Sequence, residues 1–181
     1  VAVCFSHPSI FVITSFFVVS GVGAIMRRQF RALGRLLLTA VAPAAVFLAL
    51  YILSFRQLAA NHTLLDFWNS TFMPLPPWRD WSWFPSGFHA FFAKQLGADI
   101  PLPMVLYDIL FVGGIAALLW RRAAFAAVYT LPFVLTIAAS SLHLYPFGDR
   151  MILFLAPLLY FLVAEGIAWS VGRIPSPRVR A

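Results

Sequence analysis

Charged side chains are scarce in this chain of 181 residues. Only 10% of the residues are charged, with 13 Lys and Arg against 6 Asp and Glu, whereas 62% are hydrophobic. Soluble domains carry roughly 25% charged and about 45–50% apolar residues. So few polar side chains cannot cover a core this apolar, and a soluble globular fold is therefore excluded.

Cysteine is nearly absent, since Cys4 is the only one. A single cysteine excludes a disulfide scaffold, and it argues against a zinc site of the thiolate type, which needs several sulfur ligands. The sequence therefore predicts no metal site and no cofactor in this chain.

Long apolar runs are abundant, and five of them have about the 20 residues that a helix needs to cross a bilayer. They cover residues 5–26, 36–55, 102–120, 123–144 and 151–171. Prolines inside these runs, at Pro43, Pro132 and Pro157, predict kinks rather than breaks. We expect an all-α, polytopic membrane protein with about five transmembrane helices.

The net charge is +7, and most basic residues lie in alternate connections between the predicted spans. This distribution argues against a nucleic-acid surface and predicts an orientation in the membrane. Arginines are kept on the cytoplasmic side of membrane proteins. Alternate connections hold nine basic residues and no acid, namely Arg27, Arg28, Arg31, Arg35, Arg121, Arg122, Arg173, Arg178 and Arg180. We therefore expect the segment 56–101 to be extracytoplasmic and the tail 172–181 cytoplasmic.

The chain begins with Val1 instead of methionine, and its first apolar run lacks the basic start of a signal peptide. Twelve arginines against one lysine, with abundant alanine, are typical of a GC-rich bacterial gene. We expect residues 1–181 to form a single transmembrane module from the C-terminal part of a longer protein of the bacterial inner membrane.

The predicted extracytoplasmic loop is rich in aromatic residues, and two pieces of it, 63–72 and 86–96, have helical patterns. The simpler interpretation is an aromatic belt that lies in the headgroup layer. The alternative is a wall for a sugar, an acceptor or a lipid headgroup, with flat rings for stacking and a carboxylate for hydroxyl groups. The wall would consist of Trp78, Asp80, Trp81 and Trp83.

Several polar residues fall at the predicted external ends of the spans. They are His7, Asp108, His143, Tyr145, Asp149 and Arg150. Ionisable groups in a bilayer are costly and usually face a cavity or a partner. For each residue alone a structural role is the simpler interpretation, such as pairing of Asp108 with Arg56 or Arg150. Together they favour a site that opens to the outside.

Arg150 is the most specific member of this set. An arginine at the start of a membrane helix can bind a phosphate with two parallel hydrogen bonds, next to free backbone N–H groups. Pairing with Asp149 or with lipid phosphates is the alternative. Glu165, near the predicted cytoplasmic end of the last span, is expected to pair with a loop arginine or to reach the membrane surface.

Two short segments carry a family resemblance. The stretch Tyr145-Pro146-Phe147-Gly148-Asp149-Arg150, followed by an apolar helix with Pro157, resembles a segment late in bacterial membrane glycosyltransferases of the GT-C class. These enzymes are relatives of the protein O-mannosyltransferases and form glycosyltransferase family 39. The segment Ser6-His7-Pro8-Ser9-Ile10-Phe11 resembles the opening of an earlier helix in the same proteins.

The resemblance implies an inverting glycosyltransferase (a hexosyltransferase) that moves a sugar from a polyprenyl-phosphate carrier to an extracytoplasmic acceptor. It implies that the catalytic carboxylate lies upstream of Val1, so this chain holds no catalytic residue, and that a divalent metal or basic residues hold the carrier phosphate in the full-length enzyme. Arg150 would bind that phosphate. The residues His7, Tyr145, His143 and Asp108 would line the same cavity.

Two other functions stay open. A non-catalytic membrane scaffold would use the aromatic residues only for anchoring and packing. A transporter or permease fragment is less favoured, because the middles of the spans carry almost no ionisable groups and no duplicated half is visible. The partners expected are membrane lipid and the lipid-linked sugar, not nucleic acid.

Overall fold

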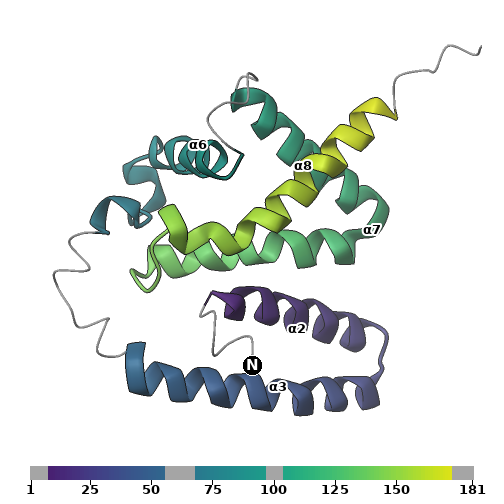
Figure 1. Cartoon of the computed structure of the whole chain (residues 1–181). Helices are drawn as coiled ribbons and strands as arrows, with labels where there is room; N and C mark the ends of the chain where they lie inside the picture. The colour runs from purple at the N-terminus through teal and green to yellow at the C-terminus, as the bar shows by residue number, and fades with distance from the viewer. Residues whose placement is uncertain (1–7, 56–67, 97–103, 173–181) are drawn as a thin grey trace, which may run out of the picture.

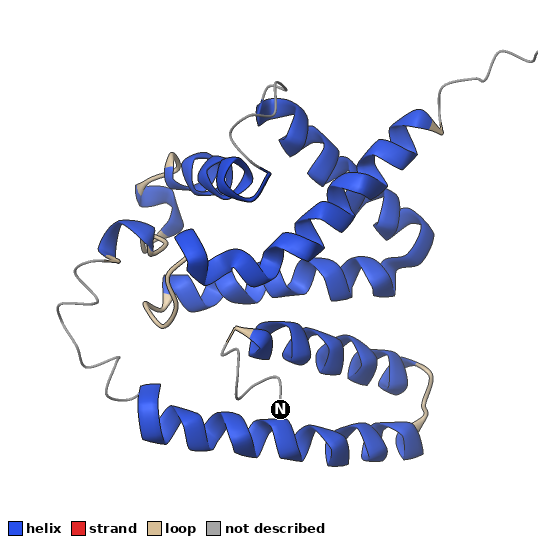
Figure 2. Cartoon of the chain, in the orientation of Figure 1, coloured by secondary structure: helices blue, strands red, loops and turns tan. Residues whose placement is uncertain are grey.

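The computed structural model describes residues 8–55, 68–96 and 104–172, apart from the side chains of residues 54, 55, 94–96, 104, 149 and 150. Helix is the regular structure in this part of the chain, and no strand occurs in it (Figure 2). Four helices are long and apolar enough to span a membrane, at Ser9–Met26, Phe30–Leu53, Val105–Ser141 and Met151–Val171. The prediction of an all-α polytopic membrane protein is confirmed.

The first two spans form a helical hairpin of α2 (Ser9–Met26) and α3 (Phe30–Leu50) (Figure 1). The turn between them includes Arg28, which has a positive φ of 54°. Helix α3 buries no side chain and continues into the π-helical turn η1 (Tyr51–Phe55). Its exposed leucines and valines suit lipid as the solvent.

The third and fourth predicted spans belong to α7 (Met104–Ser141), which is interrupted at Arg122 by non-helical torsion angles, φ −152° and ψ 72°. The helix turns sharply on itself in Figure 1, so that two arms run in different directions. We call residues 104–121 the first arm and residues 123–141 the second arm. The break lies in the connection that the sequence predicted from its two arginines.

The last span covers residues 151–171, as predicted, but it does not begin as an α-helix. Residues Asp149–Leu155 form the 3-10 helix η4, and the α-helix α8 runs from Ala156 to Val171. Pro157 therefore lies in the first turn of α8 and does not kink a helix that is already under way. A proline is tolerated there because the first backbone N–H groups of a helix have no acceptor within it.

Helix α8 crosses the first arm of α7 at two glycines. A Cβ added to Gly114 would overlap the carbonyl oxygen of Leu162, and one added to Gly166 would overlap the carbonyl oxygen of Leu110. Small residues let membrane helices approach to backbone contact. The crossing therefore depends on both glycines.

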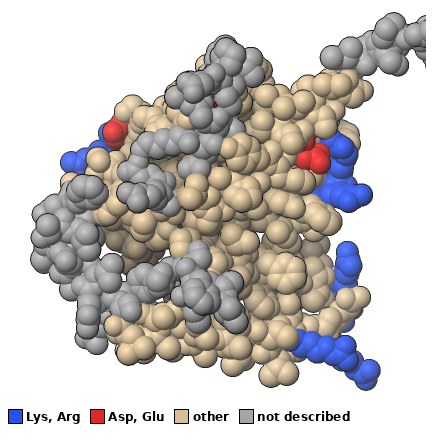
Figure 3. All heavy atoms as spheres, viewed as in Figure 1, with Lys and Arg blue, Asp and Glu red and all other residues tan. Residues whose placement is uncertain are grey.

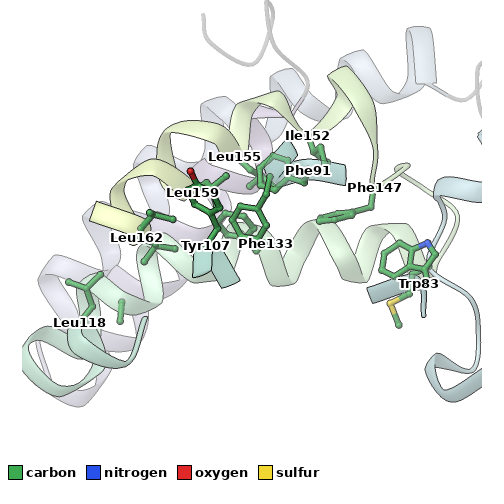
Figure 4. Close-up of a cluster of buried hydrophobic side chains, with 14 residues drawn as sticks. Trp83, Phe91, Tyr107, Leu118, Phe133, Phe147, Ile152, Leu155, Leu159 and Leu162 are labelled. Carbon is green, nitrogen blue, oxygen red and sulfur yellow. The ribbon is translucent and has the colours of Figure 1, made fainter. Parts of the chain in front are cut away.

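The core lies between the two arms of α7, α8 and the short helix α6 (Trp83–Leu96) (Figure 4). The predicted helix at 86–96 is confirmed and starts three residues earlier. Of the predicted piece at 63–72, the structure describes only the end, where Asn69–Thr71 form the 3-10 turn η2. The core side chains that Figure 4 labels are Trp83, Phe91, Tyr107, Leu118, Phe133, Phe147, Ile152, Leu155, Leu159 and Leu162.

Candidate functional site

The molecule has one end rich in arginine and one rich in aromatic residues. The arginine end is formed by the α2–α3 turn and the break in α7, and its basic residues are visible along one edge of Figure 3. They are Arg27, Arg28, Arg31, Arg35, Arg121 and Arg122. At the opposite end, which we call the aromatic end, ring contacts join Phe11 to Tyr145 and Trp83 to Phe147.

Glu165 lies toward the arginine end, with a carboxylate oxygen 3.6 Å from a guanidinium nitrogen of Arg121. The expected pairing with a loop arginine is therefore observed. It leaves the other described arginines of this end without an acidic partner in the described part of the chain.

Tyr145 occupies a structural position at the aromatic end. Its hydroxyl donates a hydrogen bond of 2.6 Å to the carbonyl oxygen of Met151. Its ring contacts that of Phe11 edge to face, with centroids 5.2 Å apart, and that of Phe154 at 6.5 Å. Burial raises the pKa of Tyr145 far above the usual range of a tyrosine. The phenol is thus a fixed donor that holds the turn before η4.

His143 lies in the same connection and has a positive φ of 55°. Its ring packs on that of Phe72, with centroids 4.8 Å apart. This contact joins the end of α7 to the loop that precedes α6. The structure thus places His143 against a ring of that loop and records no contact between His143 and Asp108.

Asp108 has a partner that the sequence did not predict. One of its carboxylate oxygens lies 3.0 Å from Nε2 of His89, which α6 presents to the first arm of α7. Both side chains are partly open, with exposed fractions of 38% for Asp108 and 41% for His89. Two features of the sequence could have indicated this pair. His89 lies in the predicted helical piece 86–96, and Asp108 lies near the start of the predicted span 102–120.

The tryptophans of the predicted wall differ in exposure, since one is buried and two are exposed. Trp83 is 8% exposed and packs on Phe147, with ring centroids 5.7 Å apart, so its ring is part of the core. Trp78 and Trp81 are 69% and 68% exposed. Two open indole rings therefore remain at the surface of the aromatic end.

Asp80, between the two open tryptophans, supports the start of α6. Its Oδ1 accepts hydrogen bonds from the backbone N–H of Ser82 at 3.0 Å and from the hydroxyl of Ser82 at 2.6 Å. This arrangement is typical of an aspartate that satisfies free N–H groups ahead of a helix. The other carboxylate oxygen of Asp80 has no recorded partner in the described part of the chain.

Two predicted site residues are described in part or not at all. His7 lies outside the described residues. The backbone of Arg150 is in the first turn of η4, whereas its side chain, like that of Asp149, lies outside the described part. The pairing alternatives for Arg150 therefore stay predictions.

A second set of contacts, which the sequence did not predict, fixes the turn that contains the resemblance segment. The backbone N–H of Phe147 donates to the carbonyl oxygen of Thr71 at 3.1 Å. The N–H of Met73 donates to the buried hydroxyl of Ser140 at 3.0 Å. A Cβ at Gly148 would lie 2.8 Å from Cγ2 of Thr71, so only glycine fits against this loop without displacing it.

Among the described residues, no group of three or more His, Cys, Asp and Glu side chains is close enough together to hold a metal ion. The chain has no significant match among protein-family models, curated proteins or solved structures. The geometry of the aromatic end and the sequence segments are therefore what bears on function.

Proposed function

We propose that this chain is the C-terminal membrane portion of an inverting glycosyltransferase, which moves a sugar from a polyprenyl-phosphate carrier to an extracytoplasmic acceptor. The observation that supports the proposal most directly is the fixed turn formed by residues 145–151. The hydroxyl of Tyr145 donates across this turn to the carbonyl oxygen of Met151, and the N–H of Phe147 donates to the carbonyl oxygen of Thr71 in η2. A segment that is pinned at both ends is suited to hold a ligand-binding residue in one place.

Arg150 follows this turn, with its backbone in the first turn of η4. In the proposal its guanidinium binds the carrier phosphate, which an arginine can do with two hydrogen bonds. Tyr145, whose hydroxyl is engaged by Met151, acts as a positioning residue for the turn. His7 and His143 are proposed to line the same cavity, and Asp108 to border it with His89.

The exposed rings of Trp78 and Trp81 are proposed as the surface that receives the sugar or the acceptor, with Asp80 between them. Flat rings stack on the apolar faces of sugars, and the free oxygen of Asp80 is available to a hydroxyl group. The catalytic carboxylate is proposed to come from the upstream part of the full-length protein, as is any divalent metal.

The orientation follows from the charge of the two ends. We propose that the arginine end faces the cytoplasm, because arginines are retained on that side, and that the aromatic end faces outward at the level of the headgroups. The membrane would be the bacterial inner membrane. This places the turn at 145–151 on the side where lipid-linked sugars are used.

The test is sugar transfer from a polyprenyl-phosphate donor by the full-length protein in membranes. Arg150→Ala should reduce transfer by at least about tenfold, which corresponds to the loss of roughly 1.4 kcal/mol of phosphate binding. Arg150→Lys should keep part of the activity, because the charge remains. Arg31→Ala removes an exposed arginine of the opposite end and should leave transfer unchanged. Undiminished transfer by Arg150→Ala at normal expression would contradict the phosphate role.

A non-catalytic scaffold is the second candidate. It is favoured by the structural use of Tyr145, Trp83 and Asp80, whose polar atoms or rings are engaged by the fold itself. The two proposals differ in lipid binding. Failure of the full-length protein to bind any polyprenyl phosphate would favour the scaffold, whereas solute flux in proteoliposomes would favour the transporter alternative.

A further inference from the structure

A groove of about 450 Å³ lies near the arginine end, where the α2–α3 hairpin meets the second arm of α7. Its volume is within the range of roughly 300–1,000 Å³ that small-molecule sites have. Apolar and aromatic side chains dominate the lining. They include Phe16, Ala24, Leu36, Phe125, Val128 and Tyr129.

The groove is long enough for a hydrocarbon chain. Along α2 it is lined from Phe16 to Arg27, which at 1.5 Å per residue corresponds to roughly 16 Å. Gly23 lies on this path, and a Cβ added there would meet nothing within 4 Å. The depth of the groove is therefore apolar and open, and its arginine-end mouth lies at the C-terminal end of α2.

One arginine lines the groove, and a second lies next to one of its lining rings. Arg27 lines the groove from the end of α2. The guanidinium carbon of Arg122 lies 5.7 Å from the ring centroid of Phe125, which lines the groove from the second arm. Neither arginine is in an ion pair within the described part of the chain, and Glu165 at this end pairs with Arg121.

We propose that this groove binds one anionic phospholipid of the surrounding bilayer, with an acyl chain between α2 and the second arm of α7 and the phosphate between Arg27 and Arg122. Basic pockets between membrane helices recognise anionic headgroups through such contacts. A zwitterionic lipid would bring an ammonium group to a mouth that offers it no acid. The site is independent of the proposed transfer reaction, which concerns the opposite end.

The charge part of the proposal is tested on the full chain, reconstituted in nanodiscs that contain equal amounts of phosphatidylglycerol and phosphatidylcholine. The probe is the phosphatidylglycerol that stays bound after extraction, counted by native mass spectrometry. Arg27→Gln combined with Arg122→Gln should reduce the retained phosphatidylglycerol by about tenfold or more. Arg79→Gln removes one charge at the aromatic end and should leave retention unchanged. Equal retention by the double variant and the parent chain would overturn the proposal.

The groove part is tested without changing any charge. Gly23→Leu fills the groove with a side chain and should also abolish retention of phosphatidylglycerol. Gly34→Leu is the matched control, because a Cβ at Gly34 meets nothing within 4 Å and this glycine does not line the groove. Retention by Gly23→Leu equal to that of Gly34→Leu would overturn the placement of the acyl chain. If circular dichroism shows that Gly23→Leu has lost helicity, the arginine variants alone test whether the groove binds the lipid.

Selectivity is the third measurement. The parent chain should retain phosphatidylglycerol in preference to phosphatidylcholine by about tenfold at equal abundance. Equal retention of both lipids would mean an unselective hydrocarbon groove and would overturn the headgroup assignment. Loss of the preference at high salt is expected, because contacts between exposed charges are screened.

Discussion

Nε2 of His89 lies 3.0 Å from a carboxylate oxygen of Asp108, which links helix α6 to the first arm of α7. The pair adds a polar contact to an interface that is otherwise aromatic. Rings of Phe88 and Phe92 on α6 lie 6.4 Å and 5.8 Å from that of Phe111 on α7. We expect the aromatic packing to hold α6 against α7, and the His89–Asp108 contact to favour one orientation of α6 about its own axis.

We predict that His89 and Asp108 are coupled weakly but measurably. A double-mutant cycle with His89→Ala and Asp108→Ala, read from the free energy of unfolding in detergent, should give about 0.2–1 kcal/mol. Larger values are not expected, because both side chains are partly exposed to solvent. Strictly additive losses would show that the contact does not hold α6.

The glycine crossing of α7 and α8 should be far more sensitive. Gly114→Ala and Gly166→Ala each place a methyl group on a backbone carbonyl oxygen of the other helix, and backbone cannot move aside as a side chain can. We expect each to lower the free energy of unfolding by about 1–3 kcal/mol. Thermal unfolding in detergent checks the result.

Gly113→Ala is the matched control for the crossing. Its Cβ would meet nothing within 4 Å, so the substitution should be neutral or stabilising by up to about 1 kcal/mol through helix propensity. A loss at Gly113 equal to that at Gly114 would mean that the helix itself, and not the crossing, responds to the added methyl group.

The spans were predictable because they depend only on the length of an apolar run. The connections between them were predictable because arginines interrupt these runs. The break at Arg122 is a clear case. The bounds of the last span were predicted as well, but its 3-10 start was not, since an apolar run has the same composition in a 3-10 helix and in an α-helix.

The contacts of the candidate site were harder to predict, because they join residues far apart in the chain. Trp83 resembled its exposed neighbours Trp78 and Trp81 in sequence, yet packing on Phe147 buries it. The sequence did not predict the contact of Asp108 with His89, which forms because α6 packs against the start of α7, whereas Arg56 and the side chain of Arg150 lie outside the described part of the chain. Only tertiary packing distinguishes these alternatives.

We predict that Ser140 is required to hold the loop before α6. Its buried hydroxyl accepts the N–H of Met73, and Ser140→Ala would leave this donor unpaired, at a cost of about 1–3 kcal/mol in the free energy of unfolding. Ser141→Ala is the control, because within the described residues the hydroxyl of Ser141 bonds to the carbonyl oxygen of Ala138 in its own helix and to no other element. It should change stability by less than about 0.5 kcal/mol. Equal effects of the two substitutions would contradict the role of Ser140.

We predict that the phenol of Tyr145 makes the free energy of unfolding depend on pH in the alkaline range. Because burial raises its pKa in the folded chain, the unfolded chain loses the phenolic proton first, near the ordinary value of ~10. The stabilisation is therefore complete below that pH and is lost as the pH rises above it. Tyr145→Phe should lower the free energy of unfolding at neutral pH by about 1 kcal/mol, through loss of the bond to Met151.

The same variant should also flatten the alkaline decline of stability, because the group that loses its proton is gone. Unfolding free energies at neutral pH and at pH of about 11 measure both effects. Tyr51→Phe removes an exposed tyrosine hydroxyl at the end of α3 and should leave the decline as it is in the parent chain. An unchanged decline in Tyr145→Phe would show that this phenol ionises as readily in the folded chain as in the unfolded one, and that the turn at 145–151 does not shield it.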